Sequence, residues 1–295
     1  MENKKEKGLV TGGAGFMGSH IADCLTFHGF QVVIFDSIKS PYLGKDQVSI
    51  VGSIEDEKLL CQAMEGCKYV YHLAGIADID ECFKRPFDAV NINILGTARV
   101  LECAAKSGIK KIIFASSAYV ASGKGSFYRI SKVAGESLMQ EYAEKYGFKF
   151  TNLRYGTLYG PRSDERNNLY RILNEILNTK CFKHRGNGEE VREFIHVLDA
   201  AGLSVKALSP EFDNQTLLLT GYQSISYKSL FSMIKEILGS EIKLEYNMED
   251  YSNHYVLTPY AYRPDVCRKM IPEVMVDFGQ GIVDLITEIN VKKDK

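Results

Sequence analysis

The chain has 295 residues, of which 25% are charged and 45% hydrophobic, and its formal net charge is −1. This composition is typical of an ordinary soluble protein with one large domain or two small ones. The balanced charge gives no electrostatic reason to expect nucleic acid or an acidic membrane surface as a partner. No apolar run approaches the ~20 residues that cross a bilayer.

Seven cysteines are scattered along the chain without a C-x-x-C pair. Their odd number and irregular spacing predict reduced thiols and no metal site. The first residues, Met1 to Lys7, are mostly charged and lead directly into an apolar run, which is unlike a secretory signal. We therefore expect a cytoplasmic protein.

A glycine-rich turn at 11–18 lies between a predicted strand at 8–10 and a predicted helix at 19–27. A second strand follows and ends at Asp36. Glycines let the backbone approach a pyrophosphate, which sits at the positive end of the helix. Asp36 can accept hydrogen bonds from the adenosine ribose and would repel a 2′-phosphate, so the pattern predicts NAD as the cofactor rather than NADP.

The alternation of strands and helices continues, with further strands predicted at 48–51, 69–74, 112–115 and 150–153 and helices at 56–66 and 89–107. This order predicts an α/β fold with a Rossmann-type, doubly wound parallel sheet. We expect an NAD-binding domain over 1–160.

The periodicity changes after Pro161. Helices are predicted at 169–178 and 230–238 and short strands at 217–219 and 242–244. We interpret 161–295 mainly as a smaller α+β substrate-binding lobe, with 190–205 returning to the first domain.

The segment from Ile112 to Lys132 carries the candidate chemistry. An apolar strand ends at Ser116-Ser117, and after a short loop Tyr128 and Lys132 stand at positions i and i+4 of a predicted helix, on one face. A nearby cation lowers the pKa of a tyrosine, whose ordinary value is near 10. With Ser117 beside it, Tyr128 could take a proton from a carbinol while hydride leaves its carbon. The alternative is a surface helix with an incidental Tyr–Lys pair.

Further motifs run nearly the whole length of the chain: His-Leu-Ala at 72–74, Asn-x-x-Gly-Thr at 93–97, Ser-Ser-Ala-x-Val at 116–120, Leu-Arg-Tyr at 153–155, Tyr-Gly-Pro-Arg at 159–162, Val-Arg-Glu-Phe-Ile-His-Val at 191–197 and Tyr-Arg-Pro-Asp at 262–265. With the glycine turn and the Tyr–Lys pair, they resemble the extended short-chain dehydrogenase/reductases. The chain is similar to their NAD-dependent nucleotide-sugar epimerase/dehydratase group, and above all to members of the UDP-glucose/UDP-galactose 4-epimerase type.

The resemblance implies that Tyr128 is the base, that Lys132 holds the ribose and lowers the tyrosine pKa, and that Ser117 binds the sugar oxygen. It implies NAD contacts from Gly12, Gly15, Phe16, Met17, Gly18, Asp36, Ser37, Ser53, Ile54, Leu73, Ala74, Gly75, Asn93, Tyr128, Lys132 and Tyr155. It implies contacts to a nucleotide-diphosphate sugar from Ser117, Ala118, Tyr119, Thr157, Asn168, Arg192 and Arg263. His72 is interpreted as a packed structural histidine.

Members of this family commonly form homodimers through a four-helix bundle, here the helices that carry 93–97 and 128–132. An apolar stripe at helical spacing, formed by Leu138, Met139, Tyr142 and Tyr146, could belong to that interface or to the core.

Several positions depart from the family pattern: Ser53 replaces an aspartate, Cys82 a serine, Ala121-Ser122 a Tyr-Gly pair and Thr157 an asparagine, and the loop from Ser117 to Tyr128 is short. These changes leave the residues needed for oxidation in place, but they make the substrate harder to identify from the sequence.

The residues after the catalytic serine bear on the reaction. The 4,6-dehydratases of this family place Asp-Glu there, whereas this chain has Ala118-Tyr119. We therefore predict a nucleotide-sugar 4-epimerase that acts by transient C4 oxidation to a 4-keto sugar, in the supply of polysaccharide precursors. The alternatives are a C4 dehydrogenase/reductase or dehydratase of the same family and a non-catalytic dinucleotide-binding regulator.

Overall fold

The computed structural model describes residues 5–239, 241–247, 254–258 and 267–293. Eight of the described strands form one all-parallel sheet, which confirms the predicted Rossmann-type α/β fold. In sheet order they are β13 (Arg268–Met270), β10 (Gln215–Leu219), β6 (Lys149–Tyr155), β5 (Lys111–Ser117), β4 (Tyr69–His72), β1 (Lys7–Thr11), β2 (Gln31–Asp36) and β3 (Gln47–Val51).

The strand order reverses between β1 and β4. From β1 the chain builds outward to β2 and β3, and it then returns to place β4, β5 and β6 on the other side of β1. Open α/β sheets bind ligands at such a switch point, outside the carboxyl ends of the strands. The glycine turn follows β1 and the Ser116-Ser117 pair ends β5, so both lie at this edge of the sheet.

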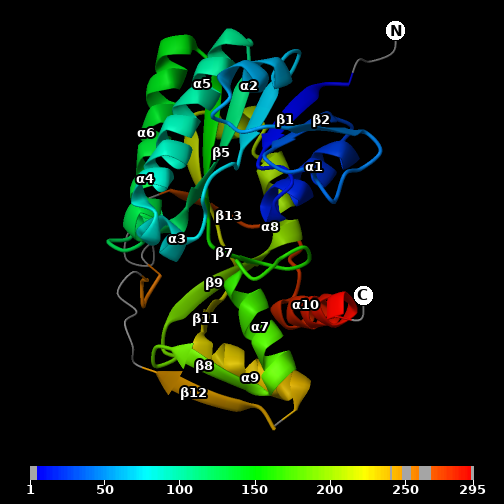
Figure 1. Ribbon diagram of the computed structural model, residues 1–295, viewed down its shortest axis with the longest axis vertical. Coiled ribbons are helices and arrows are strands. Elements are labelled where there is room, and N and C mark those ends of the chain that lie inside the picture. Colours follow the sequence, from blue (N-terminus) through cyan, green and yellow to red (C-terminus); the bar gives the residue numbers. More distant parts are fainter. Residues whose placement is uncertain (1–4, 240, 248–253, 259–266, 294–295) are drawn as a thin grey trace.

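Helices cover both faces of the sheet, because the strands are apolar on both sides. Leu9, Val33 and Ile112 belong to one buried cluster, with side chains of α2 (Glu57–Ala63), α5 (Gly96–Lys106) and α6 (Ser126–Tyr146). Val10 and Ile34, the next residues along the same strands, belong to a second cluster, with α1 (Phe16–Phe27) and α8 (Val197–Lys206). Figure 1 shows the two helix layers on opposite sides of the strands.

The helix predicted at 89–107 is divided. Its first part, η1 (Ala89–Leu95), is a π-helix that leads directly into α5. Two short helices not predicted from the sequence precede it, α3 (Ile79–Lys84) and α4 (Pro86–Asp88), and a 3-10 turn, η2 (Ala118–Ala121), follows β5. Single π-turns are common at functional sites, and Asn93 lies in this one.

A second lobe lies at the carboxyl edge of the sheet (Figure 1). It contains a three-stranded sheet of β11 (Ser224–Ser226), β9 (Val191–His196) and β7 (Thr157–Tyr159), and a parallel pair of β12 (Lys243–Asn247) and β8 (Cys181–Arg185). Its helices are α7 (Asn168–Thr179), α9 (Tyr227–Leu238) and α10 (Phe278–Lys293), which share one apolar cluster. A 3-10 turn, η3 (Pro210–Phe212), precedes β10.

The strand predicted at 217–219 does not belong to this lobe. It is β10, which pairs with β6 in the large sheet, and β13 continues the sheet beyond it. The triple-leucine run is buried, because at this place both faces of the strand are covered. Helix α8 packs against α1 beside the large sheet. The two lobes are therefore woven together, and a division at residue 160 does not follow the sheet.

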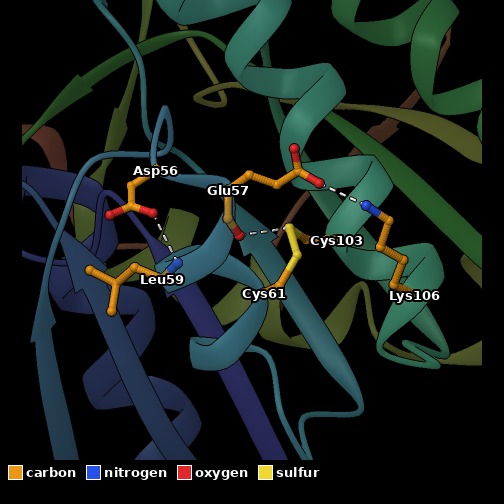
Figure 2. The surroundings of a disulfide bond; sticks show 6 residues. All are labelled: Asp56, Glu57, Leu59, Cys61, Cys103 and Lys106. Atoms are coloured by element: carbon orange, nitrogen blue, oxygen red, sulfur yellow. Dashed lines mark hydrogen bonds and ion pairs between the residues drawn. A yellow bond between two sulfur atoms is a disulfide. The ribbon is translucent and has the colours of Figure 1, made fainter.

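The structure decides between the two interpretations of the apolar stripe and corrects one prediction about the cysteines. Met139 of the stripe is fully buried, and Leu138 and Tyr142 pack against the same core, so most of the stripe is core. Cys61 and Cys103 form a disulfide between α2 and α5 (Figure 2), whereas the other five cysteines are free. The pair escaped prediction because α2 and α5 are brought together by packing, not by sequence spacing. Among the described residues, no helix is long and apolar enough to span a membrane.

Two helical glycines make a matched test of the packing. A Cβ at Gly135 of α6 would lie 2.3 Å from the Phe114 ring, whereas one at Gly202 of α8 would have no atom within 4 Å among the described neighbours. We expect Gly135→Ala to lower the free energy of unfolding by about 1–3 kcal/mol through overpacking. Gly202→Ala should raise it by about 0.5–1 kcal/mol through helix propensity. Urea unfolding measures both, and changes of the same sign would contradict this packing.

Candidate active site

The glycine turn forms a cradle at the end of β1. Gly12 has a φ of +70°, and a Cβ there would lie 2.7 Å from the backbone nitrogen of Ala74. A Cβ at Gly18 would lie 2.2 Å from the Gly12 carbonyl oxygen, so helix α1 can approach the turn closely. Within the described residues no side chain caps α1 at Gly15. The first-turn N–H groups are thus available to a pyrophosphate, and the residues fit a dinucleotide.

Asp36 faces this turn from the end of β2. Its Oδ2 accepts a hydrogen bond from the backbone nitrogen of Ala14 at 3.0 Å, and its Oδ1 lies 3.4 Å from the Ser37 hydroxyl and 3.3 Å from the nitrogen of Ile38. The carboxylate is therefore fixed beside the glycine turn while remaining partly exposed, in the position that a ribose-binding acid requires.

Ser53 and Ile54 lie between β3 and α2. The Ser53 hydroxyl accepts from the backbone nitrogen of Glu55 at 3.1 Å. Ile54 is buried against the start of α5, where a Cβ on Gly96 would come within 2.5 Å of its Cδ1. This contact fixes the segment next to α5.

A buried hydrogen-bond chain, defined here as Thr11, His72, Thr97 and Asn93, links the glycine turn to η1. The Thr97 hydroxyl donates to the Asn93 carbonyl at 2.6 Å, so it accepts from His72 Nε2 at 2.9 Å. His72 Nδ1 then accepts from the Thr11 hydroxyl at 2.8 Å, and that hydroxyl accepts from the nitrogen of Ala74 at 3.3 Å. Burial lowers the pKa of His72 to about 3, with a smaller contribution from Lys132. The ring is thus neutral, in agreement with its predicted structural role.

Asn93 extends the chain to the catalytic helix. Its Oδ1 accepts from the backbone nitrogen of Ile76 at 2.7 Å, and its Nδ2 donates to the Ile76 carbonyl at 2.9 Å and to the Ser131 hydroxyl at 3.0 Å. Ser131 in turn donates to the carbonyl of Tyr128 at 2.8 Å. The loop after β4, which contains Leu73, Ala74 and Gly75, and the first turn of α6 are therefore held by one amide.

Ser117, Tyr128 and Lys132 come together as predicted. The Ser117 hydroxyl lies close enough to the Tyr128 phenol to act on its pKa. The Lys132 ammonium lies 5.6 Å from the centre of the Tyr128 ring and donates to the Ala115 carbonyl at 2.7 Å. Ser117 also accepts from the backbone nitrogen of Tyr119 at 3.2 Å, which orients its hydroxyl at the end of β5.

The predicted direction of the Tyr128 pKa is wrong. Burial raises the pKa of Tyr128 to about 12, and the hydrogen bond from Ser117 only partly opposes this. Lys132 is itself desolvated, and burial lowers the pKa of its ammonium to about 8, with the nearby Cys82 and Glu136 acting in the opposite sense. The lysine therefore does not offset the desolvation of the phenol in this structure.

An ion pair supports the catalytic helix from behind. Arg154 of β6 donates to both carboxylate oxygens of Glu136, at 2.8 and 2.7 Å, and Ser116 donates to the same carboxylate at 2.5 Å. Both charged side chains are nearly buried. Glu136 stands one turn beyond Lys132, so the pair fixes α6 against the ends of β5 and β6.

The predicted substrate side is assembled through residues that the sequence analysis did not single out. The Tyr119 hydroxyl is 2.9 Å from His254 Nδ1, and the Tyr119 ring packs on that of Tyr255 at 4.6 Å. Backbone pairing between Val191 and Val256 at 2.9 Å places this segment beside β9.

Tyr255 also joins the remaining candidates. Thr157 lies close enough to the Tyr255 hydroxyl to act on its pKa, and the Arg192 guanidinium lies 4.2 Å from the Tyr255 ring centre and 5.8 Å from that of Tyr227. Asn168 donates to the Tyr227 hydroxyl at 2.6 Å. The predicted Tyr119, Thr157, Asn168 and Arg192 are thus connected by Tyr227, His254 and Tyr255, whose segments carry no recognisable motif.

Two candidates behave differently. Tyr155 is buried, and its hydroxyl is 2.7 Å from that of Ser204 in α8, so its side chain points into the core and not toward the cofactor edge. Arg263, with the rest of 262–265, lies outside the described residues. Ala118 is buried beside Ser117, and Phe16, Met17 and Gly18 form the first turn of α1.

A phenol, a hydroxyl and a desolvated ammonium at the edge of a nucleotide-binding sheet suit proton transfer coupled to hydride transfer. The fold and the site together define an NAD-dependent enzyme of the short-chain dehydrogenase/reductase class. Within that class, the chain belongs to the NAD dependent epimerase/dehydratase family, whose model matches residues 8–216.

Named relatives are similar over most of the chain. A putative UDP-glucose 4-epimerase of Methanocaldococcus jannaschii is 30% identical over 260 residues, which are 78% of this chain and 82% of that one. A UDP-glucuronate 4-epimerase of Thermodesulfobacterium geofontis is 27% identical over 266 residues, 81% of this chain and 82% of that one. The crystal structure of UDP-glucose 4-epimerase from Thermotoga maritima with UDP-glucose superposes with a TM-score of 0.84 at 26% identity, covering 97% of this chain and 99% of that one.

The neutral His72 predicts sensitivity to acid. Its pKa in the fold, about 3, lies below the ordinary value near 6.5. The stabilisation that the neutral His72 gives to the folded state is therefore complete above pH 6.5 and is lost as the pH falls toward 3. We expect this group to reduce the free energy of unfolding by up to ~1.4 kcal/mol per pH unit in that window.

Urea unfolding between pH 7 and pH 4 measures this loss, and His72→Gln should flatten the pH dependence. Gly202→Ala provides the control, because it leaves every titratable group in place and should keep the slope of the natural chain. The other histidines are common to all three proteins and cancel in the comparison. Parallel curves for the natural chain and His72→Gln would contradict a neutral, buried His72.

Proposed function

We propose that this protein is an NAD-dependent nucleotide-sugar 4-epimerase that acts on a UDP-sugar. The observation that carries the proposal is the convergence of Ser117, Tyr128 and Lys132 at the switch point, with Ala118 and Tyr119 where a dehydratase would need carboxylates. NAD, when bound, supplies a hydride acceptor that returns what it takes and is not consumed.

Tyr128 exchanges a proton with the C4 hydroxyl of the sugar. Its own pKa near 12 means that the phenol is protonated at neutral pH, so Tyr128 accepts the sugar proton only after its own proton has passed to solvent, through the Ser117 hydroxyl or through the fraction of Lys132 that is neutral. Lys132 can take part because the pKa of its ammonium lies near 8. Ser117 hydrogen-bonds the same sugar oxygen and orients it toward Tyr128.

Gly12, Gly15 and Gly18 with the start of α1 would hold the pyrophosphate of NAD, and Asp36 its adenosine ribose. Asn93 would act through position, because it fixes the loop that contains Leu73, Ala74 and Gly75 beside the glycine turn. Lys132 would bind the nicotinamide ribose. These assignments rest on the cradle, the uncapped helix and the fixed carboxylate described above.

The substrate diphosphate would lie against Arg192. This side chain is buried and flanked by the rings of Tyr255 and Tyr227, and a guanidinium held in a plane binds phosphate oxygens in pairs. The second lobe then encloses the sugar between Tyr119 and the cofactor edge. Relatives named for UDP-glucose and UDP-glucuronate support a UDP-sugar.

The proposal predicts inversion at C4 without net redox change. When the protein is incubated with NAD and a panel of UDP-, dTDP-, GDP- and CDP-sugars, proton NMR should show the C4 epimer of one of them, with no lasting absorbance at 340 nm. Tyr128→Phe should lower the rate by about 10²–10⁴-fold, because the proton acceptor is lost, while NAD binding is retained.

Tyr142→Phe is the control, since Tyr142 lies on the same helix but its hydroxyl donates to Glu102 at 2.8 Å, among other helices. Lasting NADH with a keto product would instead make the protein a C4 dehydrogenase, and loss of water would make it a dehydratase. Firm NAD binding with full insensitivity to Tyr128→Phe would favour a regulator without turnover.

We infer also that the protein forms a homodimer through η1 and α6, as a four-helix bundle. Val90, Leu95, Ile130 and Val133 are apolar residues of these helices that remain exposed, between 36% and 49%. A cytoplasmic location and a role in polysaccharide precursor supply complete the proposal.

A charged residue on this face should break the dimer. We expect Leu95→Glu to give a single-chain mass by light scattering, because it would place a desolvated carboxylate in an apolar interface. Val283→Glu on α10, at a comparable exposure of 38%, is the control and should leave the mass of the natural chain unchanged. A single-chain mass for the natural protein would contradict the dimer.

A further inference from the structure

The Cys61–Cys103 disulfide lies at a surface cavity that the proposed reaction does not use. The cavity has a volume of about 500 Å³ and opens between α2 and the end of α5. Lys58, Cys61, Gln62, Glu65, Lys106 and Ser107 contribute to its wall. None of these residues belongs to the candidate active site, and the volume is in the range of small-molecule sites.

The two sulfur atoms differ in access. Cys61 is partly exposed and lines the cavity, whereas Cys103 is fully buried. The Cys103 sulfur lies 3.4 Å from the carbonyl oxygen of Glu57 (Figure 2). A molecule in the cavity can therefore reach the sulfur of Cys61, and the sulfur of Cys103 is the leaving group.

We propose that this cavity is a thiol–disulfide exchange site, at which a low-molecular-weight peptidic thiol attacks Cys61 and displaces Cys103, and at which Cys103 attacks the mixed disulfide when the bond re-forms. The charges around the sulfur fit such a ligand. Lys58 and Lys106 supply two cations and Glu65 one carboxylate, the complement of a short peptide with two carboxylates and one ammonium. Lys106 is paired with Glu57 at 2.7 Å, but both side chains are more than half exposed, so this pair is weak and can exchange.

Reduction of the disulfide takes place in two exchange steps. A thiolate of the small thiol attacks the Cys61 sulfur, the Cys61–Cys103 bond breaks, and Cys103 leaves as a thiolate that takes up the proton the small thiol lost. The reduced Cys103 can donate its S–H to the Glu57 carbonyl. A second small thiol then attacks the mixed disulfide, giving two protein thiols and one small-molecule disulfide. In the reverse direction, the small-molecule disulfide is the oxidant that re-forms the bond.

The exchange alters how two helices are held. Helix α2 follows Ile54 directly and α5 begins at Gly96, which Ile54 contacts. The disulfide is the covalent link between these helices, which also share the apolar cluster that contains Leu60 and Leu101 and the exposed pair of Glu57 with Lys106 (Figure 2). Reduction therefore removes the covalent link and leaves the packing of α2 on α5 in place.

The test uses the full-length folded chain in buffers with different ratios of glutathione to glutathione disulfide. After an acid quench, denaturation and alkylation, mass spectrometry should show Cys61 and Cys103 reduced together at one ratio, in a chain that circular dichroism shows to be folded before the quench. Cys103→Ser should then form a glutathione adduct on Cys61, located by peptide mapping. Cys61→Ser should form none on Cys103, because that thiol is buried.

Substitution of the two lysines tests the cavity in a chain that keeps both cysteines. Lys58→Gln and Lys106→Gln should each slow reduction of the natural disulfide by glutathione about two- to fivefold. Reduction by uncharged 2-mercaptoethanol should keep its rate. Equal slowing by both reagents would contradict a peptidic thiol site. Cys61 and Cys103 free before any reductant is added, equal adducts on these two cysteines in the single variants, or reduction of their bond only after denaturation would overturn the proposal.

Discussion

The hydrogen-bond chain through His72 fixes the glycine turn relative to the first turn of α6 in the candidate site. The neutral ring of His72 is hydrogen-bonded to Thr11, the last residue of β1, and to Thr97. The Thr97 hydroxyl in turn donates to the Asn93 carbonyl. Each of these groups has a hydrogen-bond partner. A buried polar network whose groups are all paired is rigid and avoids the free-energy cost of unpaired buried polar atoms. The cofactor cradle and the first turn of α6 are therefore positioned relative to each other before any ligand arrives. Such preorganisation is what proton and hydride transfer between fixed partners demands.

The half of the site that holds the cofactor could be predicted from the sequence, because each of its parts is local. A turn glycine, an acid at a strand end, and a tyrosine and lysine one helical turn apart are read from short segments, and each lies where it was expected. The substrate half is not local. Arg192 acquires its environment from Tyr227 and Tyr255, which come from different segments of the chain. No spacing rule links such residues, so only the fold reveals them.

The remaining errors have the same origin. A strand such as β6 alternates its side chains between faces, and the face of Tyr155 depends on a register that motif matching does not give. The pKa of Tyr128 depends on how completely the surrounding residues exclude water from the phenol. The presence of a lysine four positions along the sequence does not predict that burial. The place of β10 depends on a free edge beside β6. The disulfide depends on two helices meeting on the same face of the sheet.

The disulfide also changes the topology of the chain around the His72 network. The covalent loop it closes spans 42 residues and contains β4, α3, α4 and η1, and thus both His72 and Asn93. Closing a loop of this length removes much of the freedom of the unfolded chain. A peptide bond cut anywhere between Cys61 and Cys103 would leave the two fragments joined through sulfur. A nicked protein could therefore keep its central hydrogen-bonded residues on one connected molecule.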